Sequence, residues 1–342
     1  MTMKIYRLIH RRTHIYAHGI VFGIVTALFG VGMMVQAYAA TPYTADQYAS
    51  SLDSTIHADD TQSVTLPNGN MLWVFGDTIQ VNGASTVSGY GYPHDEFVVQ
   101  APGTLTFTPV AGQYGYGWQQ VPNWSDGSYF WMSTPVVDGN NLYVFGQRIQ
   151  GVSPFTVVGS YVAIFDANTL AYQKIVPIPS GATGQTGWGG AVKTATGWWI
   201  TGTHPVSCSY VTDCKMGDVA HVPLGKLAIP SGWSVYNNVI PSTTNVGTTL
   251  ALIRISRGWD IFTKTGDAYG GTTIERLSTS AFSPTSGWKV NASWAAPAPS
   301  GAVSYGVAVH PEQAAPAGQV LVSYNVNDFQ STCWPLFSYL PE

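Results

Sequence analysis

The sequence has few charged residues, and basic residues are the minority among them. Asp, Glu, Lys and Arg make up 9% of the chain, with 18 acidic and 14 basic residues. Four basic residues lie within the first 39 positions, which hold no acidic residue, so the rest of the chain has a formal charge of −8 (ten against eighteen). Phosphate backbones and anionic lipids attract basic surfaces. We therefore expect neither nucleic acid nor an anionic membrane surface as a partner.

Cysteine is also scarce, with three residues in the chain. Cys208 and Cys214 are near enough to close one small loop by a disulfide, which export would permit, and they lack the paired spacing of a zinc site. Cys333 is left over. Because no histidine pattern accompanies it, we interpret Cys333 as a buried free thiol and not as a catalytic nucleophile.

Long apolar runs are absent beyond the N-terminal leader. In the leader, a basic start precedes the uncharged stretch 20–35 and the small-x-small sequence Ala37-Tyr38-Ala39. This pattern predicts a secretory signal peptide at residues 1–39 and a secreted or cell-surface domain at residues 40–342. An uncleaved anchor is the alternative, but the apolar run is short of the about 20 residues that a membrane span needs.

Helical periodicity is missing from the rest of the chain. Short apolar stretches alternate with clusters of Gly, Pro, Asn and Ser, and the chain holds 37 Gly, 12 Trp and 19 Tyr. This pattern is typical of an all-β protein with many tight turns. Only Ala45 to Leu52 is expected to form one or two helical turns.

One stretch, Leu66 to Gln80, recurs 70 positions later as Asp138 to Gln150. Both copies contain a turn glycine followed by a strand of Leu, an aromatic residue, Val, Phe and Gly. The position of Asp77 in the first copy holds Gln147 in the second. A repeat that keeps its scaffold while one polar position changes indicates a functional site at that position.

Further copies of this unit are marked by turn glycines at positions 69, 139, 197, 258 and 318. A unit of about 60 residues with four strands is typical of a β-propeller, whose blades bury their faces by stacking in a ring. The sequence therefore predicts five four-stranded blades. The last copy is short of strands, so we expect the mature N-terminus, roughly Thr41 to Asp60, to complete it and close the ring. A β-sandwich is the alternative, but it would not explain evenly spaced copies.

The start of the first strand and the end of the second strand of each unit should lie side by side, because the two strands are antiparallel. These places then meet on one face, around the central mouth. Aromatic faces and hydrogen-bonding side chains, which a sugar ring requires, gather there. The strand starts hold Asp59, Asp60, Trp131, Trp188 and Tyr305, and the strand ends hold Asp77, Gln147, Thr203, His204, Lys264 and Asn325.

The aspartates Asp77, Asp60 and Asp59 are the candidate catalytic carboxylates. Glycosidic cleavage uses one carboxyl to protonate the leaving oxygen and another as base or nucleophile. Neighbours on a strand face opposite sides, so at most one of Asp59 and Asp60 should point into the mouth. His94 and Asp95, before the third strand of the first unit, are candidate substrate contacts. Alternatively, these aspartates, histidines and aromatic residues have structural roles in strand ends, turns and the packing between blades.

The first unit also resembles a known family. An acid, a strand, Leu-Pro-x-Gly, a strand ending in Phe75-Gly76-Asp77-Thr78 and an entry into Val98-Val99-Gln100 are similar to the propeller family catalogued as domain of unknown function 4185. Characterised members of that family are endo-D-arabinanases acting on the arabinan of mycobacterial cell walls. The resemblance implies catalytic carboxylates at Asp77 and at Asp59 or Asp60. The chain departs from the family at His94-Asp95-Glu96, where Asn and a small hydroxyl residue are expected.

These observations predict a secreted, monomeric glycoside hydrolase that acts on a furanose-containing polysaccharide, with an arabinanase of cell-wall arabinan as the expected activity. No cofactor is expected, although the propeller axis could hold a structural cation. The alternative is a non-catalytic carbohydrate-binding or cell-surface interaction propeller, in which the same aromatic residues bind sugar. A sialidase is disfavoured, because the exported domain has only four arginines to form a carboxylate-binding cluster.

Overall fold

The computed structural model of the chain describes residues 42–86, 92–114, 117–151, 155–181, 183–206, 214–240, 246–265, 271–285, 287–328 and 333–342. The chain divides into Met1–Tyr38 and Ala39–Glu342, and all that follows concerns the second unit. The predicted signal peptide lies outside the described residues. The same holds for Cys208 and for the side chain of Cys214, the two members of the predicted disulfide.

Helical structure is confined to two short elements within the described ranges. The helix α1 (Ala45–Asp53) begins at Thr44, whose hydroxyl accepts from the amide of Gln47 while the Gln47 side chain returns to the Thr44 amide, a capping box. This helix confirms the prediction for Ala45 to Leu52. The second element is the 3₁₀ turn η1 (Pro230–Gly232). Neither combines the length and hydropathy needed to cross a bilayer.

All other regular structure in the described ranges is β, which confirms the predicted all-β class. The described strands form four four-stranded sheets and two three-stranded sheets, all antiparallel. The four-stranded sheets are β2 (Gln62–Thr65), β3 (Met71–Phe75), β6 (Glu96–Gln100) and β7 (Phe107–Pro109); β8 (Tyr129–Asp138), β9 (Asn141–Gln150), β10 (Thr156–Asp166) and β11 (Tyr172–Pro177); β12 (Gly187–Lys193), β13 (Gly197–Val206), β14 (Cys214–Pro223) and β15 (Ser234–Ile240); and β16 (Ala251–Ile255), β17 (Gly258–Thr265), β18 (Thr273–Thr279) and β19 (Lys289–Ala295). The three-stranded sheets are β20 (Val303–His310), β21 (Gln319–Asn327) and β22 (Cys333–Pro341), and β1 (Ile56–Ala58), β4 (Thr78–Val81) and β5 (Ala84–Ser85).

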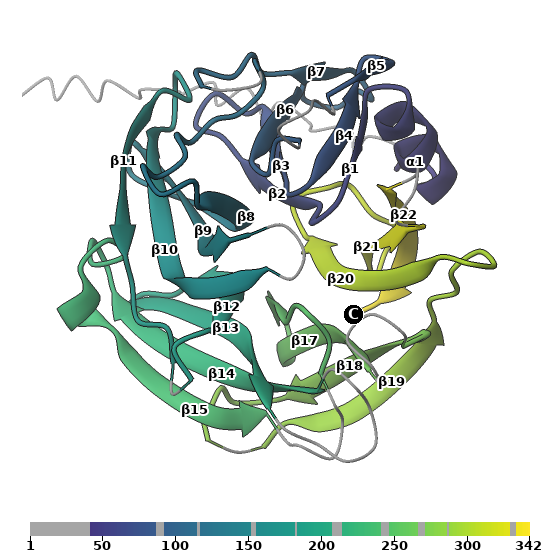
Figure 1. Ribbon diagram of the computed structural model, residues 1–342. Coiled ribbons are helices and arrows are strands. Elements are labelled where there is room, and N and C mark those ends of the chain that lie inside the picture. The colour runs from purple at the N-terminus through teal and green to yellow at the C-terminus, as the bar shows by residue number, and fades with distance from the viewer. Residues whose placement is uncertain are drawn as a thin grey trace, which may run out of the picture. The chain divides into compact units, whose positions relative to one another are not determined.

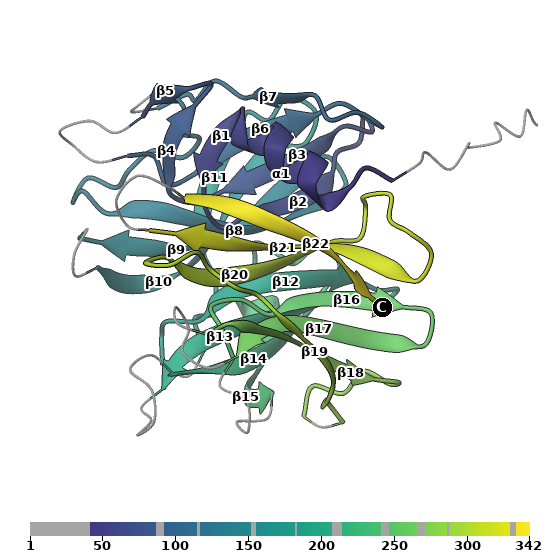
Figure 2. The ribbon, with the colours of Figure 1, turned by 90° about the vertical axis from the view of Figure 1, so that its right-hand side faces the viewer.

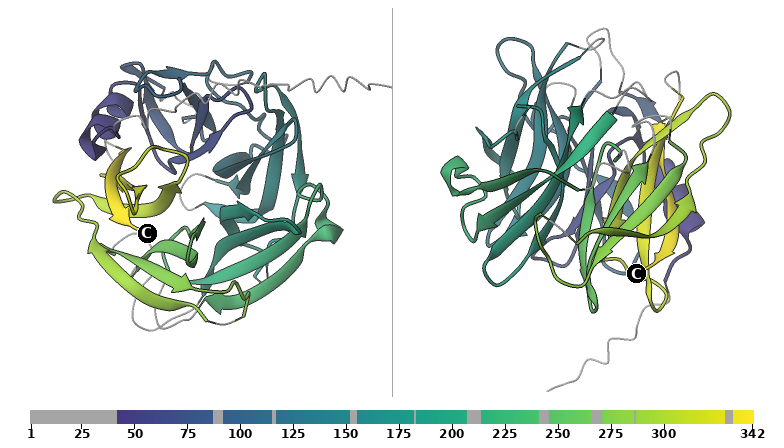
Figure 3. Two further views of the ribbon diagram at one scale, coloured as in Figure 1. Left: turned by 180° about the vertical axis from the view of Figure 1, so that it is seen from behind. Right: turned by 90° about the horizontal axis from the view of Figure 1, so that it is seen from below.

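The larger sheets lie side by side around a common centre (Figure 1). The first strand of each sheet contacts the first strand of the next, in the order β2, β8, β12, β16 and β20, and β20 in turn contacts β2. Seen from behind, the colours from purple to yellow follow one another around the same centre (Figure 3), and Figure 2 shows the sheets from the side. In this β-propeller-like arrangement, the last sheet (β20, β21 and β22) lies next to the first sheet (β2, β3, β6 and β7).

The hydrophobic core lies between the sheets. Separate clusters of buried side chains fill the space between each sheet and its neighbour. In β3, for example, Leu72 and Val74 pack toward β8 and β9, whereas Trp73 and Phe75 pack toward α1 and β21. All five residues of β3 are therefore buried. Burial on both faces explains why this strand is continuously apolar instead of alternating.

The N-terminal segment packs against the last sheet. Tyr48 and Leu52 of α1 share a core cluster with Leu321, and the Tyr339 hydroxyl donates to the carbonyl of Tyr43. Figure 1 shows α1 beside β22. Within the described part of the chain, however, β1 pairs with β4, so the N-terminal segment supplies no fourth strand to the sheet of β20, β21 and β22.

Replacing Trp188 by alanine should destabilise the fold strongly. Its side chain is 0% exposed, packs against Trp233 and donates from Nε1 to the carbonyl of Pro179. We expect the free energy of unfolding to fall by about 3–5 kcal/mol, measured by chemical denaturation. The control is Val290→Ala, because Val290 is 49% exposed, and its effect should stay within about 0.5 kcal/mol. Equal effects of the two variants would contradict this core assignment.

Candidate functional site

The strand pairing places the residues assigned to strand starts beside the residues assigned to strand ends. Trp131 pairs with Gln147, and Tyr305 pairs with Asn325. At the first unit, the amide of Asp59 donates to the carbonyl of Asp77. The start of each first strand thus lies beside the end of the second strand, as predicted from antiparallel hairpins.

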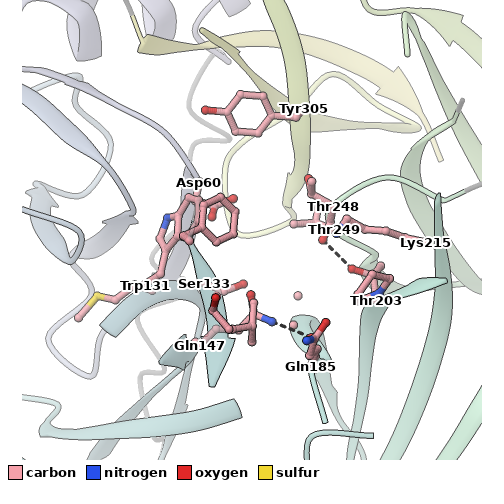
Figure 4. Close-up of a pocket in the computed structure, with 18 residues that line it drawn as sticks. Asp60, Trp131, Ser133, Gln147, Gln185, Thr203, Lys215, Thr248, Thr249 and Tyr305 are labelled. Atoms are coloured by element: carbon pink, nitrogen blue, oxygen red, sulfur yellow. Dashed lines mark hydrogen bonds between the residues drawn. The ribbon is translucent and has the colours of Figure 1, made fainter. Parts of the chain in front are cut away.

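A cavity of about 430 Å³ lies at this end of the sheets. Of the residues predicted from sequence, Asp60, Trp131, Gln147, Thr203 and Tyr305 line it. Figure 4 shows Asp60 and Trp131 on one side and Lys215 and Thr203 on the other. The walls thus combine one carboxylate with aromatic rings, amides and hydroxyls. Lining residues that the sequence did not single out include Ser133, Phe155, Thr156, Gln185, Lys215, Thr248 and Thr249.

Asp59 is buried directly behind this wall. Its Oδ2 accepts from the Tyr305 hydroxyl at 2.6 Å, and its Oδ1 accepts from the Asp77 amide at 2.7 Å. Burial, and then the nearby carboxylates of Asp77 and Asp60, raise the pKa of Asp59 well above its usual range. Burial outweighs the two hydrogen bonds, which favour the ionised form. Asp59 is therefore held in place and shielded from the cavity.

Asp60 is the carboxylate that reaches the cavity. Its backbone has φ 52°, a left-handed conformation that L-residues rarely adopt, and this turn separates its side chain from that of Asp59. Burial, with a smaller effect of the Asp77 carboxylate, raises the pKa of Asp60 to about 7. A carboxyl with this pKa exchanges its proton near neutral pH, which suits a general acid.

Asp77 is half-buried beside the aspartate pair. Its Oδ1 lies 2.5 Å from Nδ1 of His94, and the His94 ring stacks on Tyr129 with centroids 3.6 Å apart. Burial and the charge of Asp77 also raise the pKa of Tyr92. Asp77 and His94 are thus partners of each other, and neither lines the cavity.

The one glycine whose small size matters most here is Gly76. A Cβ atom on Gly76 would lie 2.4 Å from Trp131 Nε1 and 2.6 Å from Asp59 Oδ1. Real Cβ atoms do not approach other atoms so closely, so this position has no room for a side chain. Gly76 therefore allows Trp131 to approach the aspartate cluster, and this explains the glycine of the Phe-Gly-Asp-Thr sequence.

Three predicted substrate contacts are instead structural. Asp95 is fully buried and accepts from the amides of Gln120 and Val121 at 3.0 and 3.1 Å, so it anchors a loop. Lys264 is buried and donates to the hydroxyl of Ser304 at 2.8 Å. Trp188 lies in the core, as described above.

The error for Trp188 has a simple geometric origin. The partner of Thr203 is Gly187, and Trp188 pairs with Gly202. Trp188 is therefore one residue past the position that Trp131 holds opposite Gln147. A shift of one residue turns a side chain to the other face of a strand.

His204 and Asn325 lie close to the cavity but do not line it. Nδ1 of His204 lies 2.8 Å from Oδ2 of the buried Asp218, and the same oxygen accepts from the Thr186 hydroxyl at 2.7 Å. Oδ1 of Asn325 accepts from Thr61 at 3.2 Å. Both are buried polar groups with satisfied partners, which is the usual state of such groups in proteins.

For each cavity-lining residue that the sequence did not identify, the structure shows why it was missed. Thr248 and Thr249 precede the first strand of the fourth unit, which is the position that Asp60 holds in the first. Hydroxyl residues are common in loops, so their type carried no signal. Phe155 lies in a connection between β9 and β10 and contacts the Trp131 ring edge-on, with centroids 5.5 Å apart. Lys215 belongs to β14, the third strand of its sheet, where the repeat offered no equivalent.

No group of three or more His, Cys, Asp and Glu side chains within the described ranges is arranged to hold a metal ion. At the cavity, Asp60 can exchange a proton, Gln147 and the threonines can form hydrogen bonds, and aromatic side chains offer ring surfaces. One side of this site is acidic, since Asp59 and Asp77 lie behind Asp60.

Comparisons with known proteins agree with this fold. The family model described as Domain of unknown function (DUF5005) matches residues 43–339, and no curated protein matches the chain. The fold is similar to that of an endo-arabinase from Bacteroides thetaiotaomicron (8% identity, TM-score 0.53, 84% of this chain and 96% of that chain). It is also similar to a GH43_1 enzyme from Xanthomonas citri in complex with xylotriose (8%, 0.56, 87% and 93%), and to a protein from Bacteroides ovatus (13%, 0.61, 86% and 88%).

These likenesses show a fold shared with glycoside hydrolases. They support the glycoside hydrolase-like propeller that the sequence resemblance implied. The specific resemblance to domain of unknown function 4185 is not confirmed, because the matching family model is a different one.

The raised pKa of Asp60 predicts a pH-dependent stability. The folded state keeps the Asp60 proton up to about pH 7, whereas an unfolded aspartate loses it above about pH 4. Between these values the folded state binds more protons, so the free energy of unfolding falls as pH rises. Asp60→Asn removes this contribution. We expect the variant to be more stable than the wild type by at least about 1 kcal/mol at about pH 8, with a smaller difference near pH 4.

Denaturation curves at several pH values measure this effect. The matched control is Asp46→Asn, since Asp46 is an exposed aspartate, and its curve should run parallel to that of the wild type. If the curve for Asp60→Asn is also parallel to the wild type, Asp60 does not have the raised pKa.

Proposed function

The chain belongs to the family described as Domain of unknown function (DUF5005), and we propose that it is a secreted glycoside hydrolase that cleaves a furanose-containing polysaccharide. Within this class we favour endo-cleavage of cell-wall arabinan. The scaffold is a five-bladed β-propeller whose ring the mature N-terminal segment closes.

The pattern of core clusters supports the five-bladed scaffold. Buried side chains lie between each pair of successive sheets, and the cluster between the last sheet and the first also contains Tyr48 and Leu52 of α1. The N-terminal segment thereby closes the ring by packing against the last blade.

The observation that carries the hydrolase proposal is the position of Asp60. A single carboxyl with a pKa of about 7 faces a cavity whose walls offer Trp131 and Tyr305 as ring surfaces and Gln147 as a hydrogen-bonding group. Sugar sites combine such features. The likeness in fold to an endo-arabinase supports a furanose polymer as the substrate.

The mechanism assigns a role to each aspartate. Asp60, protonated below about pH 7, donates its proton to the leaving glycosidic oxygen as the bond to the anomeric carbon breaks. Asp77 is the second carboxylate, which takes a proton from the attacking water or itself attacks the anomeric carbon. Because Asp77 does not line the cavity, either role requires its carboxylate to leave His94 when substrate binds. Asp59 touches no substrate and positions its neighbours through Tyr305 and the Asp77 amide.

One observation favours the second candidate, a carbohydrate-binding propeller without catalysis. Asp77 does not line the cavity, and its carboxylate already has His94 as a partner. In that case Asp60 accepts hydrogen bonds from sugar hydroxyls, and the aromatic residues provide the affinity. The two functions share the cavity and differ in whether the glycosidic bond breaks.

Hydrolysis assays distinguish the two functions. Purified protein is incubated with arabinogalactan, linear arabinan and xylan, and released oligosaccharides are measured. We expect arabino-oligosaccharides from the wild type, and a decrease in rate of at least about a hundredfold in both Asp60→Asn and Asp77→Asn. Asp46→Asn, at the exposed aspartate, should retain the wild-type rate.

Each other outcome changes a specific part of the proposal. Release from xylan alone would keep the hydrolase and replace the sugar. Retention on arabinan without any release would establish the binding protein. Full activity of Asp77→Asn, with Asp60→Asn inactive, would remove Asp77 from the mechanism.

Trp131→Ala tests the shared cavity independently of catalysis. Trp131 is half-buried at the cavity wall, so its loss should weaken retention on the polysaccharide by about tenfold or more. Stacking of aromatic rings contributes on the order of 1 kcal/mol beyond the buried area. Affinity electrophoresis on arabinogalactan measures this effect, with Trp124→Ala as the matched control, since Trp124 does not line the cavity. Equal retention of both variants would place the sugar elsewhere.

A further inference from the structure

The cavity at Asp60 extends away from the centre of the molecule on one side. The first strands lie nearest the centre, and Asp60 and Tyr305 line the cavity there. Farther out, the lining consists of residues 155–157, which lead into β10, together with Pro205 of β13 and Lys215 of β14. Among the described lining residues, none belongs to the second or third strands of the other sheets. The cavity therefore runs outward between the sheet of β8–β11 and the sheet of β12–β15.

Phe155 is an exposed aromatic ring in this outer part of the cavity. Its side chain is 43% exposed. The other large hydrophobic side chains that are exposed in the described part of the chain are aliphatic and do not line the cavity; they are Val158, Leu224, Ile229 and Val290. Single exposed apolar side chains are common. A ring inside a cavity wall is different, because a ligand in the cavity can cover it.

Phe155 and Trp131 form a corner made of two rings. Their centroids are 5.5 Å apart, and the ring planes meet at 82°. Nε1 of Trp131 is buried, and a Cβ atom on Gly76 would lie 2.4 Å from it. The polar edge of the indole thus points toward Gly76 and not into the cavity. What the two rings offer to a ligand is hydrocarbon surface, which Val157 extends along the same wall.

A hydrogen-bonding group lies beside this corner. Gln147 lines the cavity and is the strand partner of Trp131. Its Nε2 donates to the carbonyl of Gln185 at 2.8 Å. This contact fixes the amide and leaves its oxygen to accept from a ligand hydroxyl. Apolar ring surface next to an oriented polar group is the combination that binds a sugar ring.

We propose that Phe155 and Trp131 form a second sugar subsite outward from Asp60, so that the ligand is an oligosaccharide chain. One sugar unit lies at Asp60, and the chain continues outward between the two sheets to a unit that packs against Phe155. This subsite rests on the proposed function, in which Asp60 acts on or binds the first unit. Phe155 then determines a preference for chains over single sugars, because a monosaccharide at Asp60 does not reach it.

Titration calorimetry with sugars of two lengths tests this subsite. Asp60→Asn serves as the parent protein, since it prevents cleavage during the titration. The probes are methyl arabinofuranoside and arabinotetraose, with methyl xyloside and xylotetraose as a second pair. We expect one tetrasaccharide to bind at least about tenfold more tightly than its monosaccharide. Adding Phe155→Ala should weaken binding of the tetrasaccharide about tenfold and that of the monosaccharide by less than about twofold.

Three further variants separate the ring from general effects on the fold. Phe155→Tyr keeps the ring and should keep the parent affinity for the tetrasaccharide. Val158→Ala is the matched control, because Val158 is 44% exposed on the same segment and does not line the cavity. It should change neither affinity. If Phe155→Ala does not fold, Phe155→Leu, which keeps an apolar side chain without the ring, supplies the same comparison.

Steady-state hydrolysis of the polysaccharide gives a second measure in the protein that retains Asp60. The unit at Phe155 is remote from the bond that breaks, so Phe155 contributes equally to binding of the substrate and of the transition state. Phe155→Ala should therefore raise KM about tenfold and leave kcat within about twofold. A merely structural role would lower kcat as well.

Two kinds of result have different meanings. If Phe155→Ala binds the tetrasaccharide like its parent, or loses the monosaccharide equally, the subsite is wrong and the proposed function stands. If the protein binds none of these sugars and releases none from polysaccharide, the proposed function fails, and the subsite fails with it.

Discussion

The hydrogen bond from Tyr305 to Asp59 joins two parts of the chain that are 246 positions apart. A ring of sheets can persist only if its last sheet holds its first, and here polar side chains of β20 and β21 hold residues at the start of the fold. Thr61 bonds to Asn325 and Ser63 to His310 along the same seam. These buried groups therefore satisfy one another's hydrogen bonds, which is the usual state of buried polar groups.

The seam also determines the surroundings of two buried carboxyls. Tyr305 holds Asp59 behind the cavity wall, and the left-handed turn at Asp60 directs the next carboxyl into the cavity. Along the same seam, the residues after β20 bring Glu312 beside Ser63. Burial raises the pKa of both Asp60 and Glu312 to about 7. The contacts that close the ring of sheets therefore also hold both carboxyls in buried surroundings.

Trp131 and Trp188 show what the sequence repeat predicted correctly and what it did not. The repeat predicted that the starts of the first strands meet, and the pairing of Trp131 with Gln147 agrees with it. The same repeat placed Trp188 in the equivalent position, yet Trp188 pairs one residue later and is buried. Alignment of glycines and aromatic residues cannot detect a register shift of one residue. A β-bulge turns the following side chains to the other face of the sheet, and the residue types in the strand give no sign of it.

The sequence by itself determined the all-β class, the short N-terminal helix and the recurrence of one strand unit, because these depend on local periodicity and turn residues. It also brought Asp59, Asp60 and Asp77 into one region, since they flank a single hairpin. Only the tertiary structure decided that Asp60 faces the cavity, that Asp95 and Lys264 are structural, and that Lys215 and Thr248 join the site. Each of these outcomes depends on side-chain direction and on contacts between sheets distant in sequence, which no local pattern encodes.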